Sequence, residues 1–144
     1  MSSTDPDKLF SFTLKKIHLI EKSLNLINSG GKEEFTFDIS LQITSNRDIK
    51  ESIHIMHVLI NTKKDGAKAG LIKLACSFFI PNYEEYILED DTNASLPKDL
   101  LYLLNTVVIG TMRGVMFSEF RGTVLNNAYL PVLDPRGFEK VEGK

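Results

Sequence analysis

Residues 33–44 read EEFTFDISLQIT and are the stretch that decides the fold. Phenylalanine, isoleucine and leucine occupy alternate positions from Phe35 to Ile43, and every position between them is polar. Successive side chains of a β-strand point to opposite faces of the sheet, so this alternation predicts a strand with one buried face and one solvated face. A sheet covered on one face is therefore the starting point for the fold.

Three further runs on either side of this stretch have the character of strands. Apolar and polar residues alternate from Phe10 to Lys15, and the segments 49–62 and 69–80 are rich in β-branched residues. Asp65 and Gly66 stand between the last two runs, and an Asp-Gly pair in this position is a strong hairpin signal. Connections this short predict four antiparallel strands that follow one another as a meander.

A single long helix is predicted after the strands. Residues 82–95 are acidic and polar and are interpreted as a loop, with Ser95 as the N-cap of the helix and Pro97 in its first turn. Apolar residues then recur at helical spacing from Leu100 to Val115. Strands followed by one helix predict an α+β fold: a four-stranded antiparallel sheet with a long helix packed on one face.

Size and composition predict one domain without a stabilising disulfide. The chain has 144 residues, a net charge of −2 and one cysteine. We expect a disordered N-terminus at residues 1–8, a single domain at 9–138 and a tail at 139–144. No secretory signal is visible and the apolar stretch from Leu100 to Val108 is too short to span a bilayer, so we expect a cytoplasmic protein without membrane insertion. The charge balance predicts no binding to nucleic acid.

Catalytic chemistry finds little support in the sequence. His54 and His57 are three apart in a predicted strand, so they point to opposite faces and cannot easily share a metal ion. Cys76 lies in an apolar strand and is expected to be a buried, inert thiol. We therefore expect no enzyme activity, no catalytic residue, no metal site and no cofactor.

Apolar surface is the feature that remains to be explained. The segments 49–62 and 69–80 are apolar on both faces, and one helix can cover only one of them, so the second face predicts oligomerisation or a cover formed by the N-terminal segment or the acidic loop. Residues 121–138, RGTVLNNAYLPVLDPRGF, carry apolar side chains although their glycines, asparagines and prolines prevent a regular helix. These side chains either pack onto the core or form one wall of a groove for unfolded polypeptide.

The same segment carries a family resemblance. Arg121-Gly122-Thr123, followed at unbroken spacing by Pro131-Val132, resembles the SecB export chaperones. Phe12 and Ile17 resemble the opening pattern of that family, and Phe138 falls where its second helix carries an aromatic residue. Pro135 and Gly137 predict that the second helix is short or missing here.

The resemblance implies an ATP-independent holding chaperone that binds unfolded or preprotein chains and assists protein export. It implies a cytoplasmic homotetramer, assembled as a dimer of dimers, and the translocase motor as a further partner, although the docking tail of the family is missing. The implied peptide-binding residues are Val124, Leu125, Tyr129, Leu130, Leu133 and Phe138. The implied oligomer contacts are Phe12, Leu14, Gly110 and Gly114.

Two alternatives remain at this point. The first is a SecB-like adaptor dedicated to one partner, such as a toxin–antitoxin protein or a single secreted protein. The second is a small ligand-binding or enzymatic domain.

Overall fold

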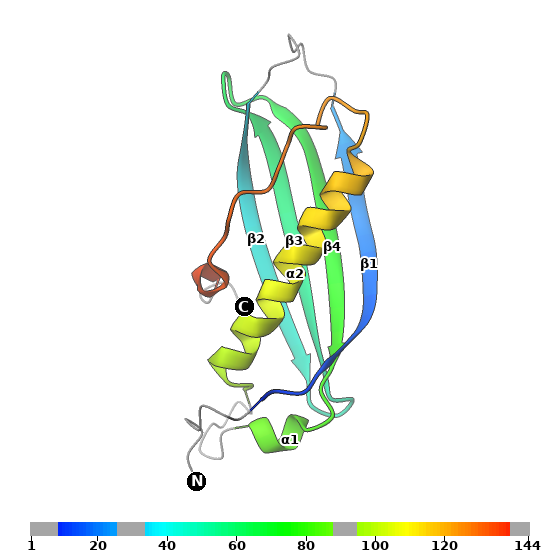
Figure 1. The fold of residues 1–144 in the computed structure, drawn as a ribbon, viewed down its shortest axis with the longest axis vertical. Coiled ribbons are helices and arrows are strands. Elements are labelled where there is room, and N and C mark those ends of the chain that lie inside the picture. Colours follow the sequence, from blue (N-terminus) through cyan, green and yellow to red (C-terminus); the bar gives the residue numbers. More distant parts are fainter. Residues whose placement is uncertain (1–8, 26–33, 88–94, 139–144) are drawn as a thin grey trace.

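The computed structural model of the chain describes residues 9–25, 34–87 and 95–138. A single antiparallel sheet is covered on one face by a long helix that runs obliquely across it (Figure 1). The strands are β1 (Thr13–Leu24), β2 (Phe35–Asn46), β3 (Glu51–Thr62) and β4 (Lys68–Phe79). The helices are α1 (Tyr83–Tyr86), α2 (Lys98–Glu119) and the 3-10 turn η1 (Pro135–Phe138). The predicted terminal segments, 1–8 and 139–144, lie outside the described residues.

The strand order is β1-β4-β3-β2, which corrects one part of the predicted topology. The hairpins β2–β3 and β3–β4 are confirmed, but β1 pairs with β4 and not with β2. Strands β1 and β2 are therefore the two opposite edges of the sheet. The meander assumed that consecutive strands are neighbours, and this holds only where a short turn joins them.

Strand β1 is longer and less regular than the sequence indicates. The register of β1 against β4 shifts between Leu14 and Lys16 and again between Leu19 and Glu21. Each extra residue of such a bulge reverses the alternation of inward and outward side chains. The period-two pattern is therefore lost after Lys15, although the strand continues to Leu24.

Both hairpin turns use one residue in the left-handed region. Gly66 adopts a φ of 69° in the β3–β4 turn, where its N–H donates to the carbonyl oxygen of Thr62 (2.9 Å). The hairpin predicted from Asp65-Gly66 is thus confirmed, with a turn longer than two residues. Lys50 adopts a φ of 58° at the end of the β2–β3 turn, a conformation that costs a non-glycine residue about 1 kcal/mol.

Helix α2 begins later than predicted. Its first helical residue is Lys98 and its N-cap is Pro97, which has extended backbone and no side chain able to cap the helix. Ser95 is therefore not the N-cap, and residues 83–86 form the short helix α1 within the segment predicted as a loop. The restriction that Pro97 places on the preceding residue delays the start of the helix.

The length of α2 also corrects the prediction about apolar stretches. Its 22 residues are long and apolar enough to cross a membrane by length and composition, contrary to the sequence-based expectation. In this structure the helix is part of the core, because one side of it packs on the sheet. The buried residues of that side are Leu100, Leu101, Leu104, Asn105, Val108, Ile109, Met112 and Met116.

The core lies between α2 and the inner face of the sheet. Alternate residues of β3 and β4, such as Met56, Val58, Leu74 and Phe78, are completely buried there. Burial of one such side chain contributes about 1.5–3 kcal/mol to folding. The residues between them face the other side of the sheet and are only half-buried, so the covered face holds the hydrophobic core.

Candidate functional site

Arg121-Gly122-Thr123 forms the turn that reverses the chain after α2. Gly122 has a φ of 76°, which glycine adopts without strain. The hydroxyl of Thr123 donates to the carbonyl oxygen of Phe120 (2.6 Å) and accepts from the N–H of Leu125 (3.1 Å). These bonds end the helix and direct the following residues back along it (Figure 1).

Two of the predicted peptide-binding residues lie in the core. Leu125 and Leu130 are almost completely buried. A Cβ atom added at Gly70 would lie only 2.6 Å from Cδ1 of Leu125, so the leucine occupies space that β4 leaves free at this glycine. In this structure Leu125 and Leu130 therefore fix the segment 121–134 to the fold.

The exposed apolar residues of this region are a different set, which we name the outer apolar set. Val124 and Tyr129 are exposed by 45% and 60%, and they belong to the predicted site. Phe117 and Val132 are exposed by 61% and 97%, and the sequence prediction missed both. Phe117 falls off the buried stripe of α2, so helical periodicity offered a signal for it.

Two arginines contact this region. Arg113 donates from Nη2 to the carbonyl oxygen of Pro131 (2.9 Å), which holds the segment from Tyr129 to Val132 beside α2. The guanidinium of Arg121 lies over the ring of Phe117, with Cζ 6.0 Å from the ring centroid. The outer apolar set (Phe117, Val124, Tyr129 and Val132) thus lies on the C-terminal part of α2 and on the segment that returns from it.

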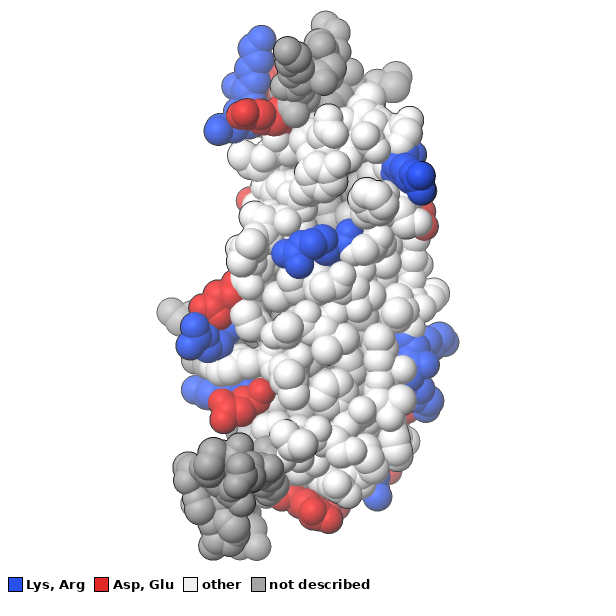
Figure 2. Space-filling view, in the orientation of Figure 1, with Lys and Arg blue, Asp and Glu red and all other residues white. Residues whose placement is uncertain are grey.

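The electrostatic character of this face suits apolar ligands. Figure 2 shows that charged side chains gather mainly along the borders of the face that carries α2, while its middle is mostly uncharged apart from a basic group. Lys22 on β1 pairs with Glu119 at the end of α2 (2.9 Å), and both side chains are about one-third exposed. Apolar surface with a charged rim favours binding of apolar polypeptide while keeping the surroundings hydrated.

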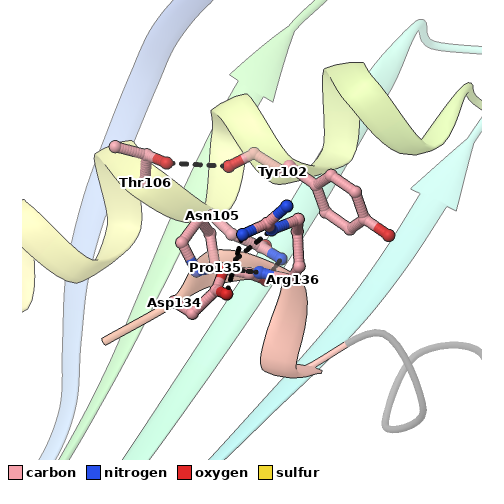
Figure 3. A network of polar contacts seen from close by, with 6 residues as sticks. All are labelled: Tyr102, Asn105, Thr106, Asp134, Pro135 and Arg136. Atoms are coloured by element: carbon pink, nitrogen blue, oxygen red, sulfur yellow. Dashed lines mark hydrogen bonds and ion pairs between the residues drawn. The ribbon is translucent and has the colours of Figure 1, made fainter.

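The segment ends in η1, at the place where the second helix of the family was predicted to be short or missing. Asp134 accepts hydrogen bonds from the backbone N–H and the side chain of Arg136, all at 3.0 Å (Figure 3). The guanidinium of Arg136 holds the pKa of the Asp134 carboxyl below its usual range. Leu133 is half-buried against the core, and the side chain of Phe138 lies outside the described part of the structure.

A buried hydrogen-bond chain anchors η1 to the core. Asn105 of α2 donates from Nδ2 to the carbonyl oxygen of Pro135 (3.3 Å), and its Oδ1 lies 2.8 Å from Nδ1 of His54 (Figure 3 shows Asn105 and Pro135). Nε2 of His54 lies 2.9 Å from Oγ of Ser52. Because Asn105 uses its amide donor on Pro135, its oxygen accepts from His54, and the neutral imidazole is satisfied on both sides.

His54, His57 and Cys76 are the remaining titratable residues that the sequence singled out. Burial lowers the pKa of His54 to about 4, and the bond to Asn105 offsets part of this effect. His57 faces the opposite side of the sheet, so the expectation that the two histidines point apart is confirmed. Burial raises the pKa of the Cys76 thiol to about 11. Among the described residues, no three His, Cys, Asp or Glu side chains form a group that could hold a metal ion.

The predicted oligomer contacts occupy two kinds of position. Gly110 and Gly114 lie on the outer side of α2, where no atom comes within 4 Å of an added Cβ. Phe12 and Leu14 are half-buried against the core instead, and Phe12 makes an edge-to-face contact with Phe78 at 5.9 Å between ring centroids. The glycines are therefore open to a second molecule, whereas Phe12 and Leu14 already have partners within the chain.

Comparison with known proteins gives a structural relative. No family model matches the chain, and no curated protein matches it. A SecB-like chaperone from Mycobacterium tuberculosis, solved in complex with a ChAD peptide from the HigA1 antitoxin, superposes with a TM-score of 0.58 at 13% identity, covering 85% of this chain and 90% of that one. A Streptococcus agalactiae protein of unknown function matches with a TM-score of 0.43 at 8% identity, covering 78% and 90% of the two chains. The chain has a SecB-like fold: a four-stranded antiparallel sheet with one long helix and a short one.

Proposed function

We propose that this protein is an ATP-independent holding chaperone that binds unfolded polypeptide through the outer apolar set. The observation that carries the proposal is the exposure of Phe117 on α2 and of Tyr129 and Val132 on the following segment, which the core residues Leu125 and Leu130 hold in place. Exposed aromatic and aliphatic side chains on a fixed scaffold bind unfolded chains by apolar contact, which requires no nucleotide. The peptide held by the SecB-like chaperone of M. tuberculosis supports a polypeptide ligand.

The assembly, location and partners implied by the SecB resemblance belong to the same proposal. It includes a homotetramer with contacts through Gly110 and Gly114, a cytoplasmic location and a contribution to protein export, with the translocase motor as an additional partner. The open space outside the two glycines supports close approach of a second helix. Leu14 lies in β1 and Phe12 directly precedes this strand, so these two half-buried residues join the proposed contact through side chains and not through strand pairing.

Suppression of aggregation tests the chaperone function. Reduced insulin aggregates in minutes, and a stoichiometric amount of this protein should prevent the rise in light scattering without ATP. The Tyr129→Asp/Val132→Asp variant should require about tenfold more protein for the same effect, because two charges oppose the apolar contact. Ser118→Asp and Asn127→Asp, at exposed positions outside the set, are matched controls that should act like the wild type. Equal activity of all variants would contradict the assignment of the site.

A dedicated adaptor is the second candidate function. It is favoured by the antitoxin peptide bound to the SecB-like chaperone of M. tuberculosis. A general holdase protects insulin and an unrelated aggregating protein such as citrate synthase equally well. An adaptor protects neither, and it retains only one natural partner in a pull-down from cell extract.

A further inference from the structure

The two edges of the sheet differ in how well they are protected from further pairing. Strand β1 has two bulges and carries Lys15, Lys16, Glu21 and Lys22. Strand β2 pairs with β3 over its full length without a register shift, and Asp38 is its only charged residue. Bulges and charges are the usual devices that keep an edge strand from pairing with another chain. The protein therefore protects the β1 edge by these devices and leaves the β2 edge without them.

The register of β2 shows which backbone groups are open. The N–H of Lys63 donates to the carbonyl oxygen of Glu34 (2.8 Å), and the regular ladder continues from this pair. In an antiparallel ladder, hydrogen-bonded pairs alternate with pairs that direct their N–H and C=O groups away from the partner. The residues that direct these groups outward are Phe35, Phe37, Ile39, Leu41, Ile43 and Ser45. Leu41 is completely buried and Ile43 nearly so, which leaves the groups of Phe35, Phe37, Ile39 and Ser45 accessible. Among the described residues, no backbone group outside β3 pairs with this edge.

The side chains of these same residues face the covered side of the sheet. Phe35, Phe37 and Ile39 are only half-buried, although they pack against the core. A strand added to this edge would place alternate side chains beside these three, since directly opposed residues of antiparallel strands share a face. The edge thus offers backbone hydrogen bonds together with an incompletely covered apolar border.

We propose that the outer edge of β2 over residues 35–39 pairs with an extended segment of the bound polypeptide and adds it to the sheet as a further strand. The inference rests on the proposed function and specifies how the polypeptide is held. Backbone pairing reads no particular sequence, so it suits a ligand with alternating apolar and polar residues of many kinds. A basic residue is favoured across from the exposed Asp38. Strand β2 itself contains no Lys or Arg, which disfavours pairing with the β2 of a second copy.

A synthetic peptide with the sequence KVTVKVTVK and an N-terminal fluorescein tests this mode of binding. In antiparallel pairing the valines face the covered side and direct their N–H groups to β2. Backbone N-methylation of the valines should weaken binding by about tenfold or more, because several hydrogen bonds are lost. N-methylation of the two threonines and the one inner lysine, whose N–H groups point away, should leave the affinity within about twofold. Equal effects of the two methylation patterns would overturn the proposal.

Amide hydrogen exchange supplies the second measurement. In the free protein, the amides of Phe37 and Ile39 should exchange fast and those of Asp38 and Ser40 slowly. Saturating peptide should slow the first group by about tenfold or more and leave the second group unchanged. Binding of the peptide without this protection would overturn edge pairing and leave the proposed holding function intact. If the protein bound neither the peptide nor reduced insulin, the holding function itself would be contradicted. Protection in the free protein that disappears on dilution would show self-pairing instead.

Discussion

Nδ1 of His54 lies 2.8 Å from Oδ1 of Asn105, which joins β3 to α2 through a hydrogen bond between two completely buried side chains. The same asparagine continues the connection to η1 through the carbonyl oxygen of Pro135. The end of the segment that carries the outer apolar set is thus anchored in the core of the molecule.

Loss of the Asn105 side chain should destabilise the fold and release η1. Asn105→Ala leaves the buried N–H of His54 without an acceptor, which costs about 1–3 kcal/mol of the free energy of unfolding. Urea denaturation measures the loss, and hydrogen exchange of the Arg136 amide reports the release of η1. Thr106→Ala is the control, because Thr106 is exposed and its hydroxyl donates to the carbonyl oxygen of Tyr102 within the same helix. Equal stability of the two variants would show that the buried bond contributes little.

His54 should make the stability depend on pH. Its pKa is about 4 in the folded chain and about 6.5 when unfolded, so the unfolded state binds the proton more readily. The free energy of unfolding is therefore fully maintained above pH 6.5 and decreases as the pH falls to 4, by about 3 kcal/mol over the whole window. Urea denaturation at pH 7.5 and 4.5 measures the difference. This difference in the free energy of unfolding should become clearly smaller in His54→Gln and persist in His57→Gln. An unchanged difference in His54→Gln would show that His54 is not the source of the pH dependence.

Gly70 and Leu125 should be energetically coupled. Gly70→Ala forces its new methyl group against Leu125 and against the carbonyl oxygen of Ser23, which would lie 2.8 Å from it. We expect a loss of about 1–3 kcal/mol. Leu125→Ala alone removes a buried side chain and costs about 2–5 kcal/mol.

The double variant separates the two contacts. Because Leu125→Ala removes one of the two clashes, Gly70→Ala should cost less in that background than in the wild type. Thermal or urea unfolding of the four proteins completes the cycle, and strictly additive costs would show that the leucine does not occupy the space above Gly70.

Gly110 and Gly114 should report on assembly. In an isolated molecule, alanine at either position has free space and should stabilise α2 by up to about 1 kcal/mol. In the proposed tetramer the added methyl groups lie where a second helix approaches, so Gly110→Ala/Gly114→Ala should lower the molar mass measured by light scattering at low micromolar concentration. Thr106→Ala, on the exposed surface of the same helix, is the matched control. A stabilised double variant with unchanged mass would place the interface elsewhere.

Periodic patterns explain which parts of this structure the sequence predicts. The alternation from Phe35 to Ile43 and the spacing from Leu100 to Val115 gave the strand β2 and the buried side of α2, since regular elements convert sequence spacing into direction. The Asp65-Gly66 pair gave the hairpin because only certain residues adopt a left-handed turn easily.

Strand pairing and contacts between residues that are distant in the sequence could not be predicted from periodic patterns. The two bulges in β1 erase its alternation, and nothing in its residues indicates that β4 is its partner. The segment 121–134 has no period, so its sequence does not separate the buried Leu125 from the exposed Tyr129. Asn105 is a polar residue within the apolar stretch of α2. The hydrogen bond that explains its burial is made with His54, which is distant in the sequence.

The strand order has a consequence for biosynthesis. Strand β1 leaves the ribosome first, but its partner β4 ends only at Phe79, after both hairpins have been made. During translation β1 must therefore wait unpaired while β2, β3 and β4 can already form a sheet. The lysines that protect its free edge in the finished protein are present throughout this interval, when a premature pairing with another nascent chain would trap the molecule.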